Sequence, residues 1–419
     1  STSNANLTIL PTAGNTAGTV TNLTLIQPNA SLTLPGNKVT GSLYINTQGG
    51  TSPTDTLTVG AQTLSGSMDL RADSGITPTG AWSIGTTANF SNTSGITLGN
   101  QIIVGGSTTL TADAGTGNII LSSTDNSLRD VTVNSGNNVT LNSSYNGGVT
   151  IGLPRTAGGL GDVTIAYPSA TGVSIYANGA GYWDQTPAEL SGNLSVTSGG
   201  TIGHYGYNWL NLTGASSTST FTAIGDITLN RSSNNLGAVT IYPTVATVNA
   251  SLYNNSTSNA NLTILPTAGN TAGKITNLTL IQPNASLILP DNKVTGSLYI
   301  NTQGDTSTTD TLTVGAQTLS GSMDLRAENG LIQSGAWSIG TTANFSNTSG
   351  MTLGNQIIVG GSTSLTARAG MGNIVLSNTA NSLRDVTVNS GNNVTLNSAY
   401  TGGVAIGLPR TAGGLHDVT

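Results

Sequence analysis

The sequence predicts an all-β chain that folds as an elongated parallel β-helix, a solenoid whose successive coils each add short strands to the same sheets. Three observations favour this fold class. Charged residues make up only 7% of the 419 residues, whereas soluble domains average roughly 25%. Short apolar–polar alternations recur along the whole chain. The chain also contains a tandem repeat of unusual length, because its first residues recur far along the sequence.

The alternations consist of two apolar residues at i and i+2 with Ser or Thr between them, followed by a small polar turn. This period of two is typical of a strand that buries one face. Such strands are expected near Ala5, Thr21, Gly117, Asn137, Gly147, Gly161, Thr171, Gly192, Gly225 and Gly237.

Turn residues separate these strands and keep them to 3–5 residues each. The chain has 56 Gly and 13 Pro, which supply positive-φ turns and end strands. No segment shows helical periodicity over ten residues. The stretch Pro187–Leu190 is expected to form at most one helical turn.

The repeat begins with STSNANLTILPTAGNTAG at Ser1 and again at Ser256, an offset of 255 residues. About 23 of the 164 overlapping positions differ. We therefore divide the chain into a first repeat, 1–255, and a partial second repeat, 256–419, in one continuous solenoid. Residues 166–255 form the less repetitive and more aromatic part of the first repeat. Because the repeat starts and stops without caps, we expect this sequence to be an internal part of a longer tandem array.

The small size of the inner motifs favours a solenoid over a string of sandwich domains. A sandwich needs self-contained modules of ~100 residues. Coils of about 20 residues, each adding a rung of ~4.8 Å, would give about 60 Å of rise per 255 residues. Inward Val, Ile and Leu would stack from rung to rung, each contributing about 1.5–3 kcal/mol.

Charge and cysteine content exclude several classes of function. The net charge of −6 provides no basic stripe for nucleic acid. The absence of Cys excludes disulfides and thiolate metal sites. No stretch approaches ~18 consecutive apolar residues, so we expect no membrane insertion of this segment.

The motifs GNLSVTSGGTI (192–202), STTLTADAGTGNIILSS (107–123) and NNVTLNS resemble the repeats of filamentous-haemagglutinin-type adhesins. These are giant bacterial exoproteins exported by two-partner secretion, a branch of type V secretion. The resemblance covers essentially the whole chain. It implies a right-handed parallel β-helix that forms a surface filament or stalk.

Candidate catalytic groups are scarce. Glycoside hydrolysis needs two carboxylates about 5–9.5 Å apart, but Asp125 is replaced by Ala380 in the second repeat. The pair Arg129 and Asp130 does recur, and we interpret it as a surface ion pair or a turn hydrogen bond. His204 lacks a second His with which to hold a metal. We therefore expect no catalytic residue, no cofactor and no metal.

The aromatic residues of the less repetitive part are the one candidate binding site. If exposed, these side chains could stack on sugar rings; the alternative is that they pack in or over the solenoid. The five are Tyr182, Trp183, Tyr205, Tyr207 and Trp209. In contrast, Trp82 and Trp337 lie in identical GAWSIG contexts and are expected to pack in the core or laterally.

These observations favour a non-enzymatic, extracellular filament segment at the cell surface, a stalk that mediates attachment. Its expected partners are further copies of itself, surface polysaccharide, or a receptor on a host or neighbouring cell. The alternatives are a sheath or envelope polymer and a polysaccharide-binding or polysaccharide-degrading β-helix protein. Ice binding would need Thr side chains in register on successive rungs, and the variable spacing of the T-x-T stretches argues against it.

Overall fold

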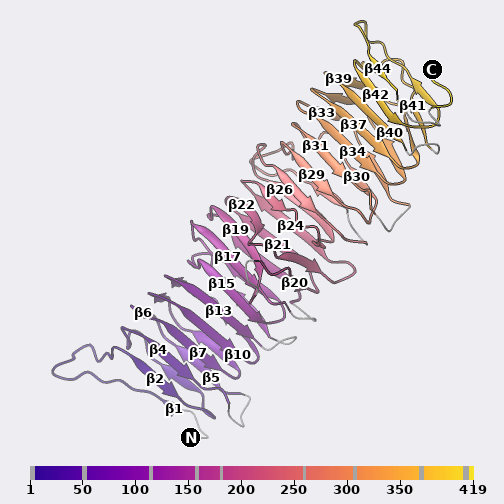
Figure 1. The fold of residues 1–419 in the computed structure, drawn as a ribbon. Coiled ribbons are helices and arrows are strands. Elements are labelled where there is room, and N and C mark those ends of the chain that lie inside the picture. The colour runs from indigo at the N-terminus through magenta and orange to yellow at the C-terminus, as the bar shows by residue number, and fades with distance from the viewer. Residues whose placement is uncertain are drawn as a thin grey trace. The chain divides into compact units, whose positions relative to one another are not determined.

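A computed structural model describes residues 5–49, 54–112, 117–155, 160–179, 183–257, 261–304, 309–367, 372–408 and 415–419. The chain divides into two compact units, Ser1–Gly214 and Ala215–Thr419. Each unit is a β-solenoid of stacked parallel strands, and no helix occurs in the described ranges (Figure 1). The predicted all-β, parallel β-helical fold class is therefore confirmed.

In unit 1, most strands belong to two long sheets and a short third one. The first long sheet contains β2 (Leu23–Ile26), β4 (Leu43–Asn46), β7 (Met68–Ala72), β10 (Ala88–Asn92), β13 (Ser107–Ala112), β15 (Asp130–Ser135), β17 (Gly148–Leu153), β19 (Gly172–Ala177) and β22 (Thr201–His204). The second face contains β1 (Ala5–Asn6), β3 (Leu32–Leu34), β5 (Thr56–Val59), β8 (Gly75–Pro78), β11 (Gly95–Leu98), β14 (Asn118–Leu121), β16 (Val139–Asn142), β18 (Val163–Tyr167) and β21 (Leu194–Ser198). The short sheet contains β6 (Gln62–Leu64), β9 (Trp82–Ile84) and β12 (Ile102–Val104), and a separate pair is β20 (Pro187–Leu190) with β23 (Trp209–Leu212).

Unit 2 repeats this arrangement. Its first long sheet contains β25 (Ile227–Leu229), β27 (Ala250–Tyr253), β29 (Leu278–Ile281), β31 (Leu298–Asn301), β34 (Met323–Ala327), β37 (Ala343–Asn347), β40 (Thr363–Ala367), β42 (Val386–Ser390) and β44 (Ile406–Gly407). Its second face contains β24 (Thr218–Ala223), β26 (Ala238–Pro243), β28 (Leu262–Ile264), β30 (Leu287–Leu289), β32 (Thr311–Val314), β35 (Gly330–Gln333), β38 (Gly350–Leu353), β41 (Asn373–Leu376) and β43 (Val394–Leu396). Its short sheet contains β33 (Gln317–Leu319), β36 (Trp337–Ile339) and β39 (Ile357–Val359).

A typical coil has three sides. The chain passes from β7 to β8 to β9 and then returns as β10, which pairs in parallel with β7. Each side is limited to 3–5 residues here because the chain must turn at every corner. At one such corner a Cβ on Gly105 would lie 2.3 Å from the carbonyl oxygen of Gly85 on the preceding coil. Only glycine allows the backbones to stack this closely.

The core consists of the inward residue of every alternation. Leu70 is fully buried and pairs with Ile45 on one side and Phe90 on the other. Val139 and Leu141 of β16 are likewise buried, with half-buried Thr140 between them on the opposite face. The period of two in the sequence therefore predicted the inward face correctly.

Trp82 and Trp337 pack in the core, as expected. Both are 1% exposed. The Trp82 Nε1 donates to the Gly60 carbonyl at 3.0 Å, and the Trp337 Nε1 donates to the Gly315 carbonyl at 2.9 Å. The hydrogen bonds satisfy the one polar atom that each indole brings into the core.

The two sequence repeats build the same series of coils. In each unit, the residues that pair from one rung to the next occupy equivalent positions of the two repeats. The number of residues per coil therefore changes in the same sequence in both units. The register also shifts at the same place, between Leu110 and Thr111 and between Leu365 and Thr366. The two series are Leu43, Met68, Ala88, Thr108, Val131 and Ile151, and Leu298, Met323, Ala343, Thr363, Val386 and Ile406.

One coil of unit 1 is clearly longer than the length predicted for a typical coil. It runs from Val173 of β19 to its register partner Ile202 of β22. The additional residues include β20, which lies outside the three main sheets and pairs with β23. This long coil falls in the less repetitive part of the first repeat.

Candidate functional surfaces

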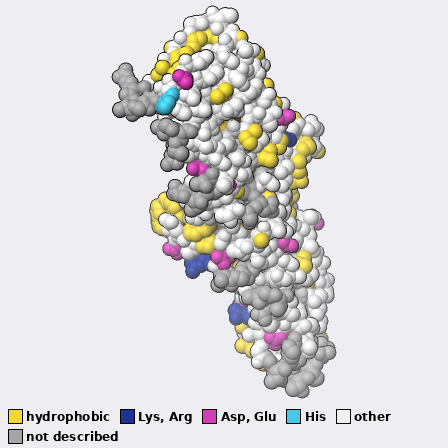
Figure 2. Space-filling view, turned by 90° about the vertical axis from the view of Figure 1, so that its right-hand side faces the viewer, with side chains coloured by type: hydrophobic (Ala, Val, Ile, Leu, Met, Phe, Trp, Pro, Cys, Tyr) yellow, Lys and Arg dark blue, Asp and Glu magenta, His cyan; other side chains and the backbone are white. Residues whose placement is uncertain are grey.

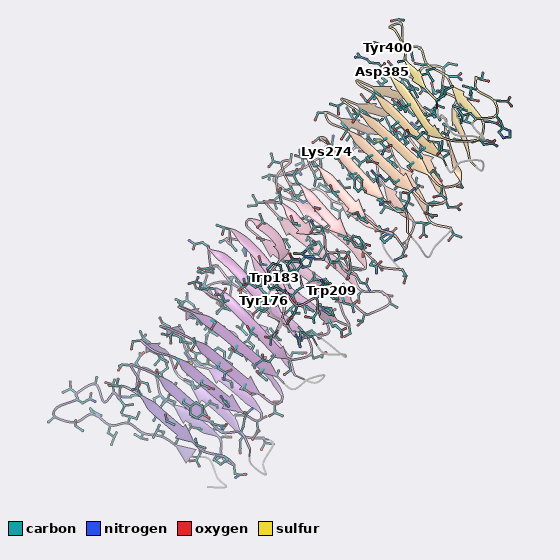
Figure 3. All side chains as sticks on the ribbon, in the orientation of Figure 1. Tyr176, Trp183, Trp209, Lys274, Asp385 and Tyr400 are labelled. Atoms are coloured by element: carbon teal, nitrogen blue, oxygen red, sulfur yellow. The ribbon has the colours of Figure 1, made fainter. Side chains whose placement is uncertain are left out.

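The aromatic residues of unit 1 lie where that long coil meets the next one. Strand β22 ends at His204, and a turn follows in which Gly206 has a φ of 67°. This turn carries Tyr205 and Tyr207 and leads into β23, which begins at Trp209. Figure 3 labels three side chains in this part of unit 1, Tyr176, Trp183 and Trp209.

Tyr176 lies on the outer face of the long sheet, over a glycine of the preceding rung. Its register partner is Gly152, and a Cβ at Gly152 would lie 2.6 Å from the phenol ring. The missing side chain lets the ring lie along the sheet, and its hydroxyl reaches the Thr132 hydroxyl, 3.1 Å away and two rungs back. Tyr176 was not among the candidate residues predicted from the sequence. Gly152 makes room for its ring, but the two residues can be matched only once the register is known.

Tyr205 continues this aromatic row onto the next rung. Its backbone N–H donates to the carbonyl of Ile175 at 3.0 Å, which places it beside Tyr176. The two ring centroids are 5.7 Å apart with an interplanar angle of 60°. Tyr205 remains 47% exposed, so Tyr176 supports one side of a ring that is still partly accessible to solvent.

Trp183 and Tyr207 form a second aromatic pair. Their ring centroids are 4.9 Å apart and the planes differ by 28°, a stacked arrangement. Trp183 is 72% exposed, whereas Tyr207 is half-buried. Tyr207 thus stacks on the indole, most of whose side chain is accessible to solvent.

Trp209 is half-buried at the start of β23, and Tyr182 lies outside the described residues. In β20, Pro187 pairs with Trp209 and Glu189 pairs with Asn211. The segment Pro187–Leu190, for which the sequence allowed at most one helical turn, therefore forms a strand. Ala188 and Leu190 are buried on one face, and strand pairing with β23 outweighs the local sequence preference. We define the aromatic cluster as Tyr176, Trp183, Tyr205, Tyr207 and Trp209.

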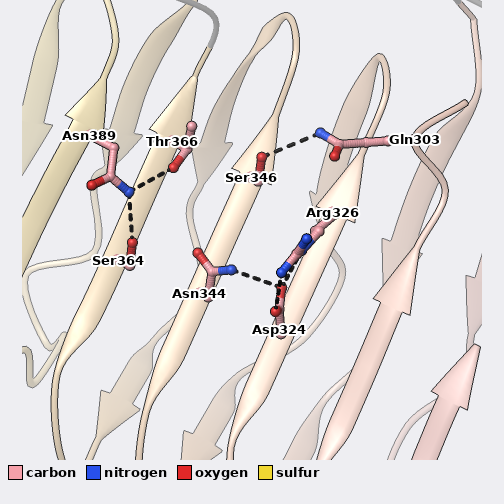
Figure 4. A network of polar contacts seen from close by, with 8 residues as sticks. All are labelled: Gln303, Asp324, Arg326, Asn344, Ser346, Ser364, Thr366 and Asn389. Carbon is pink, nitrogen blue, oxygen red and sulfur yellow. Dashed lines mark hydrogen bonds and ion pairs between the residues drawn. The ribbon is translucent and has the colours of Figure 1, made fainter. Parts of the chain in front are cut away.

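Polar side chains outside this cluster are bonded to one another along the long sheet. In unit 2 the contacts join neighbouring rungs or, from Gln303 to Ser346, rungs two apart (Figure 4). The amide of Asn344 donates to Asp324 at 2.9 Å, Gln303 donates to Ser346 at 3.3 Å, and Asn389 donates to Ser364 at 2.9 Å and to Thr366 at 3.0 Å.

Two repeated ion pairs belong to this outer face. Asp69 and Arg71 form a contact of 2.9 Å on β7, as Asp324 and Arg326 do on β34. Hydrogen bonding to Asp69 raises the pKa of Arg71 above its usual value. Each guanidinium also lies over a tyrosine ring of the preceding rung, for example Tyr44 at 5.6 Å. These groups bind one another and stabilise the register.

The other charged residues do not gather into a site. Arg129 and Asp130 form the expected ion pair, at 3.6 Å and largely exposed. Within the described ranges, no group of three His, Asp or Glu side chains could hold a metal ion. On the face seen in Figure 2, charged side chains stand singly or in small groups on a mostly uncharged surface. The described residues also contain no helix that is long and apolar enough to cross a membrane.

Several threonines of the second face lie in register on successive rungs, contrary to expectation. Variable spacing argued against threonines in register, but Thr33, Thr58 and Thr77 are direct register partners. The turns absorb the differences in coil length, so that reasoning was wrong. The second repeat nevertheless replaces Thr33 and Thr77 by Ile288 and Ile332, which are exposed. A threonine array is therefore not kept from one repeat to the next.

Comparison with known proteins adds one family. Residues 51–101, 184–242 and 303–357 match a family model described as repeats of unknown function (DUF5649). No curated protein and no solved structure matches the chain. The first and third matched segments are equivalent parts of the two 255-residue repeats. Sequence, fold and family match together describe a repetitive β-solenoid that contains segments similar to DUF5649 repeats.

Proposed function

We propose that this chain is a non-enzymatic segment of an extracellular, cell-surface filament, the stiff β-solenoid stalk of a large adhesive protein. The observation that carries the proposal is the reuse of one series of coil lengths and one register shift in both repeats. A stalk can be lengthened by adding such units, because each coil contacts mainly its neighbours.

The differences between the repeats support a mechanical role. Buried Ile96 becomes Met351, which is also buried, so the apolar stack is kept. Charged Asp125 becomes Ala380. An enzyme would require its charged groups to be kept, whereas a stalk requires only inward apolar residues and polar turns.

The mostly uncharged outer faces suit lateral packing against further stalks, surface polysaccharide or a receptor. Export by two-partner secretion agrees with the resemblance to filamentous-haemagglutinin-type repeats. A sheath or envelope polymer would use the same coils, but its filament would consist of many separate chains.

Electron microscopy of the intact protein on its native cells tests the proposal. We expect a thin surface filament. In-frame deletion of one complete repeat should shorten it by about 50 Å, because the first long sheet takes 11 steps from β4 to its equivalent β31, fewer than the 13 coils expected from the sequence, and each step adds ~4.8 Å. A filament of unchanged length after the deletion would favour a polymer of separate chains. A soluble particle with no surface location would refute the stalk.

A further inference from the structure

The aromatic cluster contains the exposed aromatic side chains of the described part of the chain. Trp183 is 72% exposed and Tyr205 is 47% exposed; the remaining described aromatic side chains are half-buried or buried. Leaving large rings in water forgoes the free energy that burial would provide, about 1.5–3 kcal/mol for a large apolar side chain. A contiguous exposed apolar patch is one mark of an interaction site, and Tyr207 connects the two exposed rings, because it stacks on Trp183 and lies two residues after Tyr205.

Each exposed ring is supported by a second ring. Tyr207 stacks on Trp183 and Tyr176 contacts Tyr205. Tyr176 is in turn held by Gly152 and the Thr132 hydroxyl. This support limits the motion of the exposed rings before any ligand arrives, which lowers the entropic cost of binding.

The groups around the rings are hydrogen-bonding but mostly uncharged. Asn178 donates to the Asn134 side chain at 2.7 Å beside the Tyr176 row, and Asn211 donates to Glu189 at 3.5 Å beside Trp209. The charged residues near the two tryptophans are two acids, Asp184 and Glu189, and one base, Arg155, which donates to the Gly179 carbonyl at 3.4 Å. With two acids against one base, this surface offers an anionic ligand little net attraction, whereas a neutral ligand rich in hydroxyl groups would find acceptors and donors.

A pyranose ring has this chemistry: an apolar face of C–H groups, which the negative face of an aromatic ring attracts, and a rim of hydroxyl groups. We propose that the aromatic cluster binds an uncharged polysaccharide, with Trp183 as the main stacking surface and Tyr205 as a second one. This assignment rests on the adhesive part of the proposed function and refines it. The filament itself could form without it, so microscopy and glycan binding fail independently.

Binding to the purified full chain tests the proposal. The probes are hexasaccharides of β-1,4-linked glucose and of N-acetylglucosamine, together with soluble xylan, and dextran sulfate serves as the anionic comparison. We expect binding of at least one neutral probe, a change of tryptophan fluorescence on binding, and no competition by dextran sulfate. Trp183→Ala should weaken binding about tenfold, and adding Tyr205→Ala should weaken it further.

Two further variants keep the result interpretable. Trp183→Phe retains a ring and should lose less affinity than Trp183→Ala. Tyr242→Ala removes a half-buried tyrosine from β26 and should leave binding unchanged. Circular dichroism checks that every variant keeps its β structure.

Absence of binding to every neutral probe would overturn the proposal, as would equal binding by Trp183→Ala and the parent chain. Tighter binding of dextran sulfate than of neutral glycans would also overturn it. If Trp183→Ala instead abolishes self-association in sedimentation velocity without altering glycan binding, the cluster is a contact between copies of this chain.

Discussion

Replacing one buried leucine by aspartate gives the sharpest test of the solenoid's inward face. Leu141 is fully buried in β16, between Leu121 and Ile165 on the neighbouring rungs. Leu141→Asp forfeits about 1.5–3 kcal/mol of apolar burial. It also places an unpaired carboxylate in the core, which costs several kcal/mol more. We expect the opening free energy of this part of unit 1 to fall by at least about 4 kcal/mol.

Hydrogen exchange measured by mass spectrometry reports this loss rung by rung. A fall of about 4 kcal/mol corresponds to exchange roughly 10³-fold faster. The informative amides are those of Val139, which donates to the Asp162 carbonyl, and Ser143, which donates to Ala166. The matched control is Thr140→Asp, which introduces the same carboxylate on the outer face of the same strand and should change the opening free energy by less than about 0.5 kcal/mol.

If Leu141→Asp and Thr140→Asp accelerate hydrogen exchange equally, the assigned inward face is refuted. Uniform acceleration along the whole of unit 1, with no maximum near β16, would refute the view that each coil is stabilised mainly by its neighbours.

Two further predictions concern buried aromatic side chains. Trp82→Phe and Trp337→Phe should each lower the free energy of unfolding by about 1–3 kcal/mol, because each removes a buried hydrogen bond to a glycine carbonyl. Urea denaturation of the two single variants should show similar losses of unfolding free energy. Clearly unequal losses would mean that the two repeats do not pack their cores alike. Burial raises the pKa of the Tyr167 hydroxyl, so the unfolded chain releases this proton first and stability falls as pH rises above about 10. Tyr167→Phe should show a shallower alkaline decline in its urea midpoint, and an unchanged slope would contradict the assignment.

The sequence by itself determined the fold class and the inward set. The alternation of VTL in β16 was enough to place Val139 and Leu141 inside and Thr140 outside, because the side-chain period of a strand is a local property. Paired GAWSIG contexts likewise predicted that Trp82 and Trp337 pack alike. Near-identity of the two repeats implied that one set of coils is used twice.

Only the tertiary structure decided which outward residues meet. Tyr176 lies over Gly152 of the coil before it and beside Tyr205 at the end of the coil that follows. Coil lengths vary between these residues, and turns of different length bring strands back into register in ways that local sequence does not encode. The same reason explains why the aligned threonines were missed and why Pro187–Leu190 proved to be a strand. The inward face follows from local alternation, whereas the outward surface depends on hydrogen-bond register between distant coils.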